Sequence, residues 1–189
     1  MSEELEDIRE FIASSVREGF DSVHDIVENA GHYALETHGR DDLRADTKRM
    51  TAELVAAHRA EQTDWEGSTD CDRLDQAFAE LNKRGIVARQ NFSCCINCGF
   101  AEIWDEVDEA EKSHPVDGYV FYHLQCTEHA IKSKQLLMAY GSIEEDTEAL
   151  QRVVNTTVQE LRRVGLNATW GGTTGHPIVV EGIVWRRRR

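Results

Sequence analysis

Hydrophobic residues in the first third of the chain recur at helical spacing. Three stripes follow the i, i+3, i+4, i+7 pattern of an amphipathic helix with one buried face. We therefore expect helices only in this region, with His58 on the buried side of the third. The stripes are Leu5, Ile8, Phe11, Ile12, Ser15 and Val16; Val23, Ile26, Val27, Ala30, Tyr33 and Ala34; and Leu43, Thr47, Met50, Leu54, Ala57 and Trp65.

The best candidate for a domain boundary is the polar stretch that runs from Trp65 to Thr69. Thr69 followed by Asp72 resembles a capping box that opens the next helix. The sequence therefore predicts an acidic helical region over residues 1–68 and a second domain over residues 69–189.

From residue 69 onward the hydrophobic period alternates between that of a helix and that of a strand. Glycines end several of the segments, and Ser142 with Glu145 suggests a second capping box. From residue 86 the predicted order is β-α-β-β-α-β and one more β, which is the pattern of a ferredoxin-like split βαβ core. We expect an α+β domain with an antiparallel sheet, helices on one face and an added C-terminal hairpin. Its strands are predicted at residues 86–92, 118–124, 135–140, 166–170 and 178–185.

Charge is distributed unevenly along the 189 residues. Residues 1–80 carry 21 acidic and 8 basic side chains, and these give −13 of the net charge of −14. Such a surface disfavours nucleic acid and anionic membranes as partners, although it can dock an unknown protein partner. The terminal run of four arginines, residues 186–189, is expected to be solvated or to fold back onto the acidic half.

The N-terminus lacks the features of a secretory signal, and no apolar run is long enough to cross a bilayer. We therefore expect a cytoplasmic protein whose five cysteines are mainly reduced. An odd number of cysteines also argues against a full disulfide framework.

Three of the five cysteines, Cys94, Cys95 and Cys98, stand together where the first predicted strand gives way to a helix. Backbone N–H groups at a helix start stabilise a thiolate, and the Cys-x-x-Cys spacing places two sulfurs on one side of a turn. In a split βαβ core the end of the second strand would lie about 10 Å away, two strand spacings along the same edge. We therefore predict a zinc site formed by Cys95, Cys98, Cys126 and His123, with Cys94 and His129 as further candidates.

Two other interpretations remain open. In the first, the protein is a thiol redox protein or thiol enzyme that uses Cys95 or Cys98 as the attacking thiolate, with Glu102 one turn away as a base. In the second, it is a structural interaction module whose cysteines are buried and inert. No motif assigns a catalytic residue or an organic cofactor, so the leading interpretation is a small binding or regulatory protein rather than an enzyme.

Three stretches together resemble a bacterial family described only as a domain of unknown function. They are Gly85–Phe92 running into Cys94-Cys95-x-x-Cys98-Gly99 and Glu102; Gly118-Tyr119-Val120-Phe121-Tyr122-His123 with Gln125, Thr127 and Glu128; and Trp170, Ile178 and Trp185 near the end. The resemblance covers roughly residues 70–187 and supplies no reaction. It implies an acidic residue at the position of Cys126, and hence an alternative site of Cys94, Cys95, Cys98, Glu102 and His123.

Overall fold

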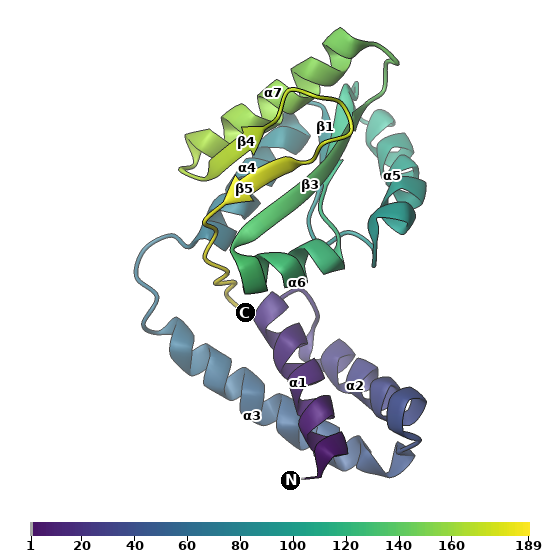
Figure 1. Cartoon of the computed structure of the whole chain (residues 1–189), viewed down its shortest axis with the longest axis vertical. Coiled ribbons are helices and arrows are strands. Elements are labelled where there is room, and N and C mark those ends of the chain that lie inside the picture. The colour runs from purple at the N-terminus through teal and green to yellow at the C-terminus, as the bar shows by residue number, and fades with distance from the viewer. Residues whose placement is uncertain (1) are drawn as a thin grey trace. The chain divides into compact units, whose positions relative to one another are not determined.

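The computed structural model describes residues 2–189, which divide into two compact units (Figure 1). The helical unit contains residues 2–67 and, from the other end of the chain, Arg186–Arg189. The α+β unit contains residues 68–185. The four terminal arginines belong to the helical unit, although the predicted second domain included them. No helix in the described part of the chain is long and apolar enough to cross a membrane.

The helical unit consists of the predicted three helices and one short 3-10 turn. Ser2 caps the first helix by accepting a hydrogen bond from the backbone N–H of Leu5, and Ser22 forms a reciprocal capping box with Asp25. The elements are α1 (Glu3–Glu18), α2 (Val23–His38), η1 (Asp41–Leu43) and α3 (Arg44–Gln62).

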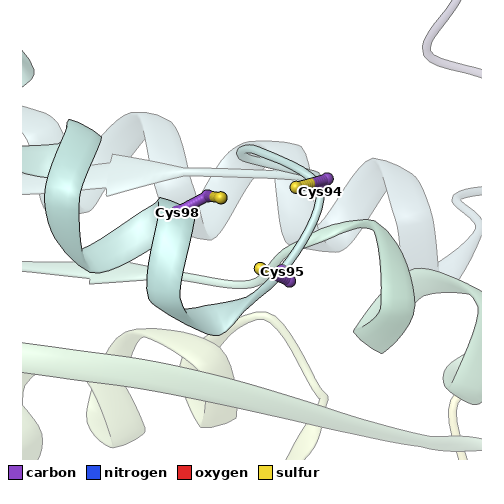
Figure 2. A group of neighbouring side chains, drawn as sticks. All are labelled: Cys94, Cys95 and Cys98. Atoms are coloured by element: carbon purple, nitrogen blue, oxygen red, sulfur yellow. The ribbon is translucent and has the colours of Figure 1, made fainter.

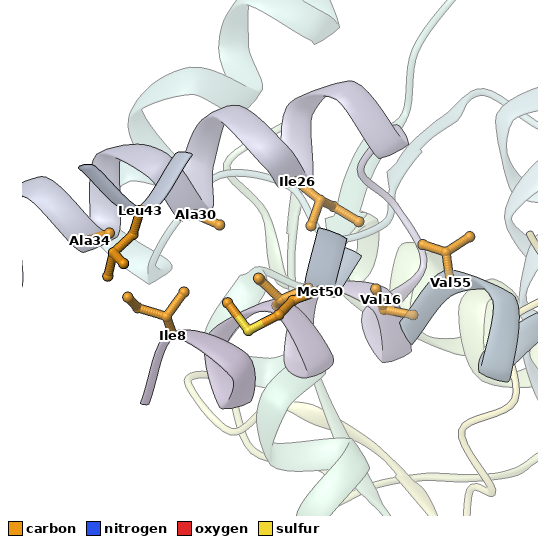
Figure 3. Packing of buried hydrophobic residues seen from close by; sticks show 9 residues of the cluster. Ile8, Val16, Ile26, Ala30, Ala34, Leu43, Met50 and Val55 are labelled. Atoms are coloured by element: carbon orange, nitrogen blue, oxygen red, sulfur yellow. The ribbon is translucent and has the colours of Figure 1, made fainter. Parts of the chain in front are cut away.

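The stripes of the three helices meet in one apolar core, which Figure 3 shows from close by. The side chains of Ile8, Ile12 and Ile26 are fully buried there. Burying a side chain of this size contributes roughly 1.5–3 kcal/mol, so these three isoleucines stabilise the unit substantially. The remaining buried members are Val16, Ala30, Ala34, Leu43, Met50 and Val55.

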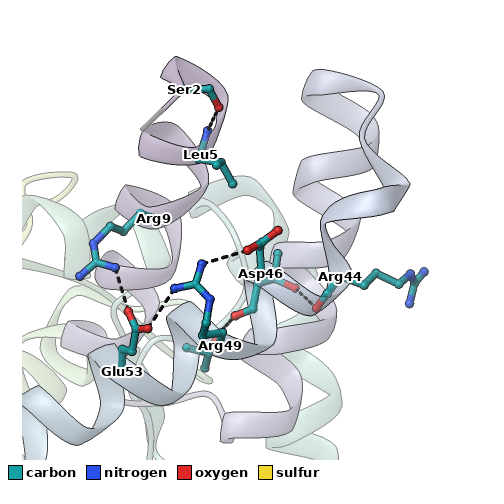
Figure 4. A network of polar contacts seen from close by, with 9 residues as sticks. Ser2, Leu5, Arg9, Arg44, Asp46, Arg49 and Glu53 are labelled. Carbon is teal, nitrogen blue, oxygen red and sulfur yellow. Dashed lines mark hydrogen bonds and ion pairs between the residues drawn. The ribbon is translucent and has the colours of Figure 1, made fainter.

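Ion pairs on the surface of the helical unit are exposed. Glu53 of α3 accepts hydrogen bonds from Arg9 at 3.4 Å and from Arg49 at 3.0 Å, and Arg49 also donates to Asp46 (Figure 4). All four side chains are at least a third exposed, so each pair contributes little to stability.

The arginine tail folds back onto the helical unit mainly through carbonyl and aromatic contacts. The guanidinium of Arg187 lies 4.3 Å from the centre of the Phe20 ring, and its carbonyl oxygen accepts from Nε2 of His58 at 3.0 Å. Arg188 donates to the carbonyl oxygens of Trp65 and Gly67. His58 is buried, as its place in the stripe predicts, and it helps to anchor the tail.

The α+β unit contains four helices and five strands. Thr69 and Asp72 form the predicted capping box at its first helix, whereas the box predicted from Ser142 and Glu145 is wrong. Ser142 lies in a strand, and the helix that follows is capped by Asp146. The elements are α4 (Asp70–Lys83), β1 (Ile86–Arg89), α5 (Ile96–Glu111), β2 (Gly118–Phe121), α6 (Leu124–Ser133), β3 (Gln135–Ser142), α7 (Thr147–Arg163), β4 (Asn167–Trp170) and β5 (Ile178–Glu181).

The strand order is β1-β2-β3-β5-β4, which confirms an α+β fold but corrects the predicted ferredoxin-like arrangement. β1 and β2 are parallel and directly paired, with Val87 opposite Tyr119, so no strand separates them. The split unit lies in the second half instead. β3 and β4 are both antiparallel to β5, which runs between them, and they are therefore parallel to each other. The sheet is mixed, and the C-terminal hairpin joins it through β5.

Helices cover both faces of the sheet, whereas the sequence analysis expected them on one (Figure 1). α4 and α7 pack together on one face. On the other face, Ile103 and Val107 of α5 pack onto the sheet. Their partners are Val87 of β1 and the alternate β2 residues Tyr119 and Phe121, which point to the same face. The adjacent parallel pair β1-α5-β2 therefore places the starts of α5 and α6 at one edge of the sheet, a single strand spacing apart.

Candidate functional site

The three clustered cysteines lie where the loop after β1 meets α5. Cys94 is in the loop, Cys95 is the N-cap residue, and Cys98 is in the first turn of the helix. The loop is attached to the neighbouring strand end, because the N–H of Phe92 donates to the carbonyl of Tyr122 and the N–H of Leu124 donates to the carbonyl of Ser93. Asn91 and Ser93 both have positive φ, which turns the chain sharply after β1. The sharp turn brings Cys94 and Cys95 to the beginning of the helix.

The three sulfurs converge. The Sγ atoms of Cys94, Cys95 and Cys98 all lie within 4.8 Å of one another. Figure 2 shows the three side chains around the start of α5. Cys94 is exposed, and Cys95 and Cys98 are partly exposed. The interpretation of buried, inert thiols therefore does not apply to this cluster, although it does describe Cys71 on α4.

Cys95 is the N-cap residue of α5, and the pKa of its thiol lies below the ordinary value. Hydrogen bonding from the backbone N–H of Cys98, aided by the thiols of Cys98 and Cys94, lowers the pKa of Cys95 below that of an ordinary thiol. The first turn of a helix carries partial positive charge, which favours the same charged form. Both effects favour the thiolate form of Cys95.

Cys98 behaves in the opposite way. Interactions with the thiols of Cys94 and Cys95 raise the pKa of Cys98 to about 11. A second thiolate beside Cys95 would repel the first, so the proton stays on Cys98 unless a cation joins the group. A divalent metal ion removes this repulsion by coordinating the thiolates.

The other two residues of the predicted zinc site belong to the next strand–helix junction. His123 is the N-cap residue of α6, and its Nε2 lies 3.3 Å from the sulfur of Cys126. Neither residue is in the group whose ligand atoms all lie within 4.8 Å, so the structure brings Cys94, Cys95 and Cys98 together and keeps Cys126 and His123 as a separate pair.

The remaining candidates also lie outside the cysteine group. Glu102 is exposed on α5, and His129 is exposed on α6. Among the residues that the structure describes, the group contains neither a carboxylate nor an imidazole. The ligand set that the geometry offers is therefore three thiols.

A family model described as Domain of unknown function (DUF6891) matches residues 1–189. The chain belongs to this family. The match extends beyond the stretch recognised from the sequence, because it includes the N-terminal helices. Comparisons with curated proteins and with solved structures gave no match.

Within this family fold, sequence reasoning missed the pairing of His123 with Cys126. The three-residue spacing of His123 and Cys126 could have indicated it. An N-cap residue and the third residue of the helix that it opens face each other, as in a capping box. His123 and Cys126 hold these two positions at the start of α6. Burial lowers the pKa of His123 and raises the pKa of Cys126, so both are uncharged near neutral pH.

Proposed function

We propose that this protein is a small binding or regulatory protein that holds a thiophilic metal ion, with zinc as the first choice, through Cys94, Cys95 and Cys98. The observation that carries the proposal is the convergence of the three sulfurs within 4.8 Å. Zn–S bonds of about 2.3 Å in a tetrahedral centre place neighbouring sulfurs roughly 3.8 Å apart, so only small side-chain movements are needed.

Three protein ligands leave the fourth position of a tetrahedral zinc ion open. Water or an incoming donor can occupy that position, and the exposure of Cys94 gives it access. A structural zinc site is usually closed by four protein ligands. An open, exposed site suits metal exchange, sensing or recognition of a ligand through the metal.

Cobalt provides the sharpest test, because each thiolate bound to Co²⁺ adds to an absorption band in the near ultraviolet. We expect the metal-free, reduced protein to bind one Co²⁺ with the intensity of three thiolates, and Zn²⁺ to displace it. Cys95→Ser is expected to weaken binding by about 100-fold or more. Cys126→Ser and Cys71→Ser, which lie outside the cluster, are the matched controls and leave it unchanged. If Cys126→Ser weakens binding as much as Cys95→Ser does, the three-ligand site is wrong.

The contrast between Cys95 and Cys98 favours thiol redox chemistry as a second candidate function. A thiol with a lowered pKa beside one that stays protonated is the arrangement of an attacking cysteine and its resolving partner. In that chemistry the Cys95 thiolate attacks a disulfide of a substrate and displaces one substrate thiolate. Cys98 then attacks the mixed disulfide, which releases the second substrate thiolate and leaves a Cys95–Cys98 disulfide.

Trapping separates this candidate from metal binding. If the redox function holds, Cys98→Ser accumulates a mixed disulfide at Cys95 when it is treated with a small disulfide, whereas the unaltered protein releases both thiols and gains an internal disulfide. Peptide mass analysis identifies both species. Failure of the unaltered protein to form the internal disulfide contradicts a redox function and leaves the metal proposal intact.

A further inference from the structure

A cavity of about 470 Å³ lies in the α+β unit beside the start of α5. Ile96 and Phe100 of α5 form one wall, and His123 and Cys126 of the next junction form another. β3 supplies residues 137–140, and the loop before β5 supplies residues 174–177. The volume falls within the range typical of pockets for small organic molecules.

The cavity exists because β5 pairs with only part of β3. The ladder between them ends at Met138 opposite Ile178, whereas β3 continues to Ser142 along β2. Ala139 and Tyr140 therefore follow the last residue of β3 that pairs with β5, and both line the cavity. The cavity thus lies where β3 extends beyond its pairing with β5, beside the loop that precedes β5.

The described residues that line the cavity include no Asp, Glu, Lys or Arg. This is notable in a chain of which 30% is charged. Apart from the exposed imidazole of His176, the wall offers no group that can carry a charge opposite to that of a ligand. A charged ligand would therefore lose hydration with little compensation, which costs more than transferring an uncharged one. The wall therefore selects against carboxylates, phosphates and amines.

The polar part of the wall includes the pair of His123 and Cys126. His123 is only 8% exposed, and its Nδ1 is buried with no partner among the described residues, while its Nε2 contacts the thiol of Cys126. Burial holds the pKa of the imidazole below its ordinary value, so the ring is uncharged at neutral pH. An uncharged imidazole and a thiol both hydrogen-bond to a hydroxyl or carbonyl group.

We propose that this cavity binds a small, uncharged, largely apolar molecule that presents one hydroxyl or carbonyl group to the pair of His123 and Cys126. The apolar body contacts Ile96, Phe100 and Leu137, all of which line the cavity. Ile96 directly follows Cys95 in sequence, so a bound molecule lies next to the helix turn that carries the thiols. The proposal does not depend on metal at the cysteine cluster.

Titration of the full chain with 1-naphthol, followed by the fluorescence of the probe, tests the proposal. We expect saturable binding of one molecule per chain, and binding at least about tenfold weaker for the charged analogues 1-naphthoate and 1-naphthylmethylammonium. Leu137→Trp fills the cavity and is expected to weaken binding by about tenfold or more. Val184→Trp, at an exposed apolar position that does not line the cavity, is the matched control and leaves binding unchanged.

A chemical readout keeps the test valid if Leu137→Trp does not fold. In a variant that combines Cys94→Ser, Cys95→Ser and Cys98→Ser, bound 1-naphthol is expected to slow the alkylation of Cys126 by N-ethylmaleimide. The same variant is expected to retain full affinity for the probe, which separates this proposal from the metal site. Absence of saturable binding, equal affinity for 1-naphthoate, or unprotected Cys126 would each overturn the proposal.

Discussion

Two strand–helix junctions lie side by side at one edge of the sheet, and their thiols differ. After β1, Cys95 is the N-cap residue of α5, between Cys94 in the loop and Cys98 in the first helical turn, and its pKa is lowered. After β2, His123 opens α6 with Cys126 beside it, and burial raises the pKa of that thiol. Both junctions offer a helix N-terminus.

The difference shows that a helix start alone does not make a reactive cysteine. Cys95 holds the N-cap position, where the backbone N–H of Cys98 favours its thiolate and lowers its pKa, and the site is partly exposed to solvent. Cys126 lies within the first turn, in a half-buried position beside an uncharged imidazole. Burial and the neighbouring groups, rather than the helix start alone, therefore set how readily each thiol ionises.

The largest expected effect is in thiol reactivity. In the reduced, metal-free protein at pH 7, Cys95 is expected to react with iodoacetamide at least about 100-fold faster than Cys126, because its thiolate is stabilised and accessible. Peptide mass analysis over time measures both rates in the same sample, and buried Cys71 serves as the internal control. Equal alkylation rates for Cys95 and Cys126 would show that the two junctions do not differ in thiol reactivity.

The next effect concerns the packing that positions the first junction. A Cβ atom at Gly99 would lie 2.4 Å from the ring of Phe121, which is fully buried and has no room to move. Gly99→Ala is therefore expected to lower the free energy of unfolding by about 1–3 kcal/mol and to weaken metal binding. Urea unfolding measures the first effect. Gly31→Ala, at a helical glycine with open space around it, is the control and does not destabilise the protein.

A smaller effect is expected from the hydrogen bond that connects the two junctions. Thr127 of α6 is buried and donates to Oδ1 of Asn91, in the loop before the cysteines, at 2.7 Å. Thr127→Val leaves that amide oxygen without its donor and is expected to cost about 1–2 kcal/mol of unfolding free energy. Thr157→Val is the matched control, because the Thr157 hydroxyl is equally buried but bonds only within its own helix. An equal loss in both variants would mean that the connection contributes nothing specific.

The smallest expected effect is a pH dependence at the second junction. Burial depresses the pKa of His123 below the ordinary value of 6.5, so the unfolded chain takes up this proton more readily than the folded chain. Above pH 6.5 His123 is neutral in both states and does not lower the free energy of unfolding. As the pH falls from 6.5 towards the folded-state pKa, the unfolded chain is protonated first, and the free energy of unfolding decreases. From pH 8 to pH 5, the unfolding free energy of the unaltered protein is expected to fall more steeply than that of His123→Gln. Parallel slopes in urea titrations would contradict the account of His123.

Hydrophobic periodicity predicted the helices, because each stripe in the first third has a single buried face and meets the others in one core. Strand order was harder to predict. A β-α-β pattern reads the same whether its strands are adjacent or split, and only pairing partners distant in sequence distinguish the two. The start of β5 at residue 178 was predicted, but its pairing with β3 and the register that sets Ile178 opposite Met138 were not, which is why the cavity was not anticipated.

The candidate site was also predicted only in part, because part of it depends on local sequence and part on strand order. Cys94, Cys95 and Cys98 are close in sequence, so local geometry brings their sulfurs together whatever the sheet order. Adding Cys126 and His123 required the topology, which was wrong in its first half. With β1 and β2 adjacent, the second junction is nearer than predicted, yet its two side chains bond to each other and stand apart from the cysteine group.

The most direct test of the central claim is to measure zinc content and accessible thiols together on protein purified without chelator. The account predicts one zinc per chain, with three thiols protected from a thiol reagent until a chelator removes the metal, and protection mapped to Cys94, Cys95 and Cys98. Less than about 0.2 zinc per chain after incubation with excess zinc, with all three thiols freely reactive, would contradict it.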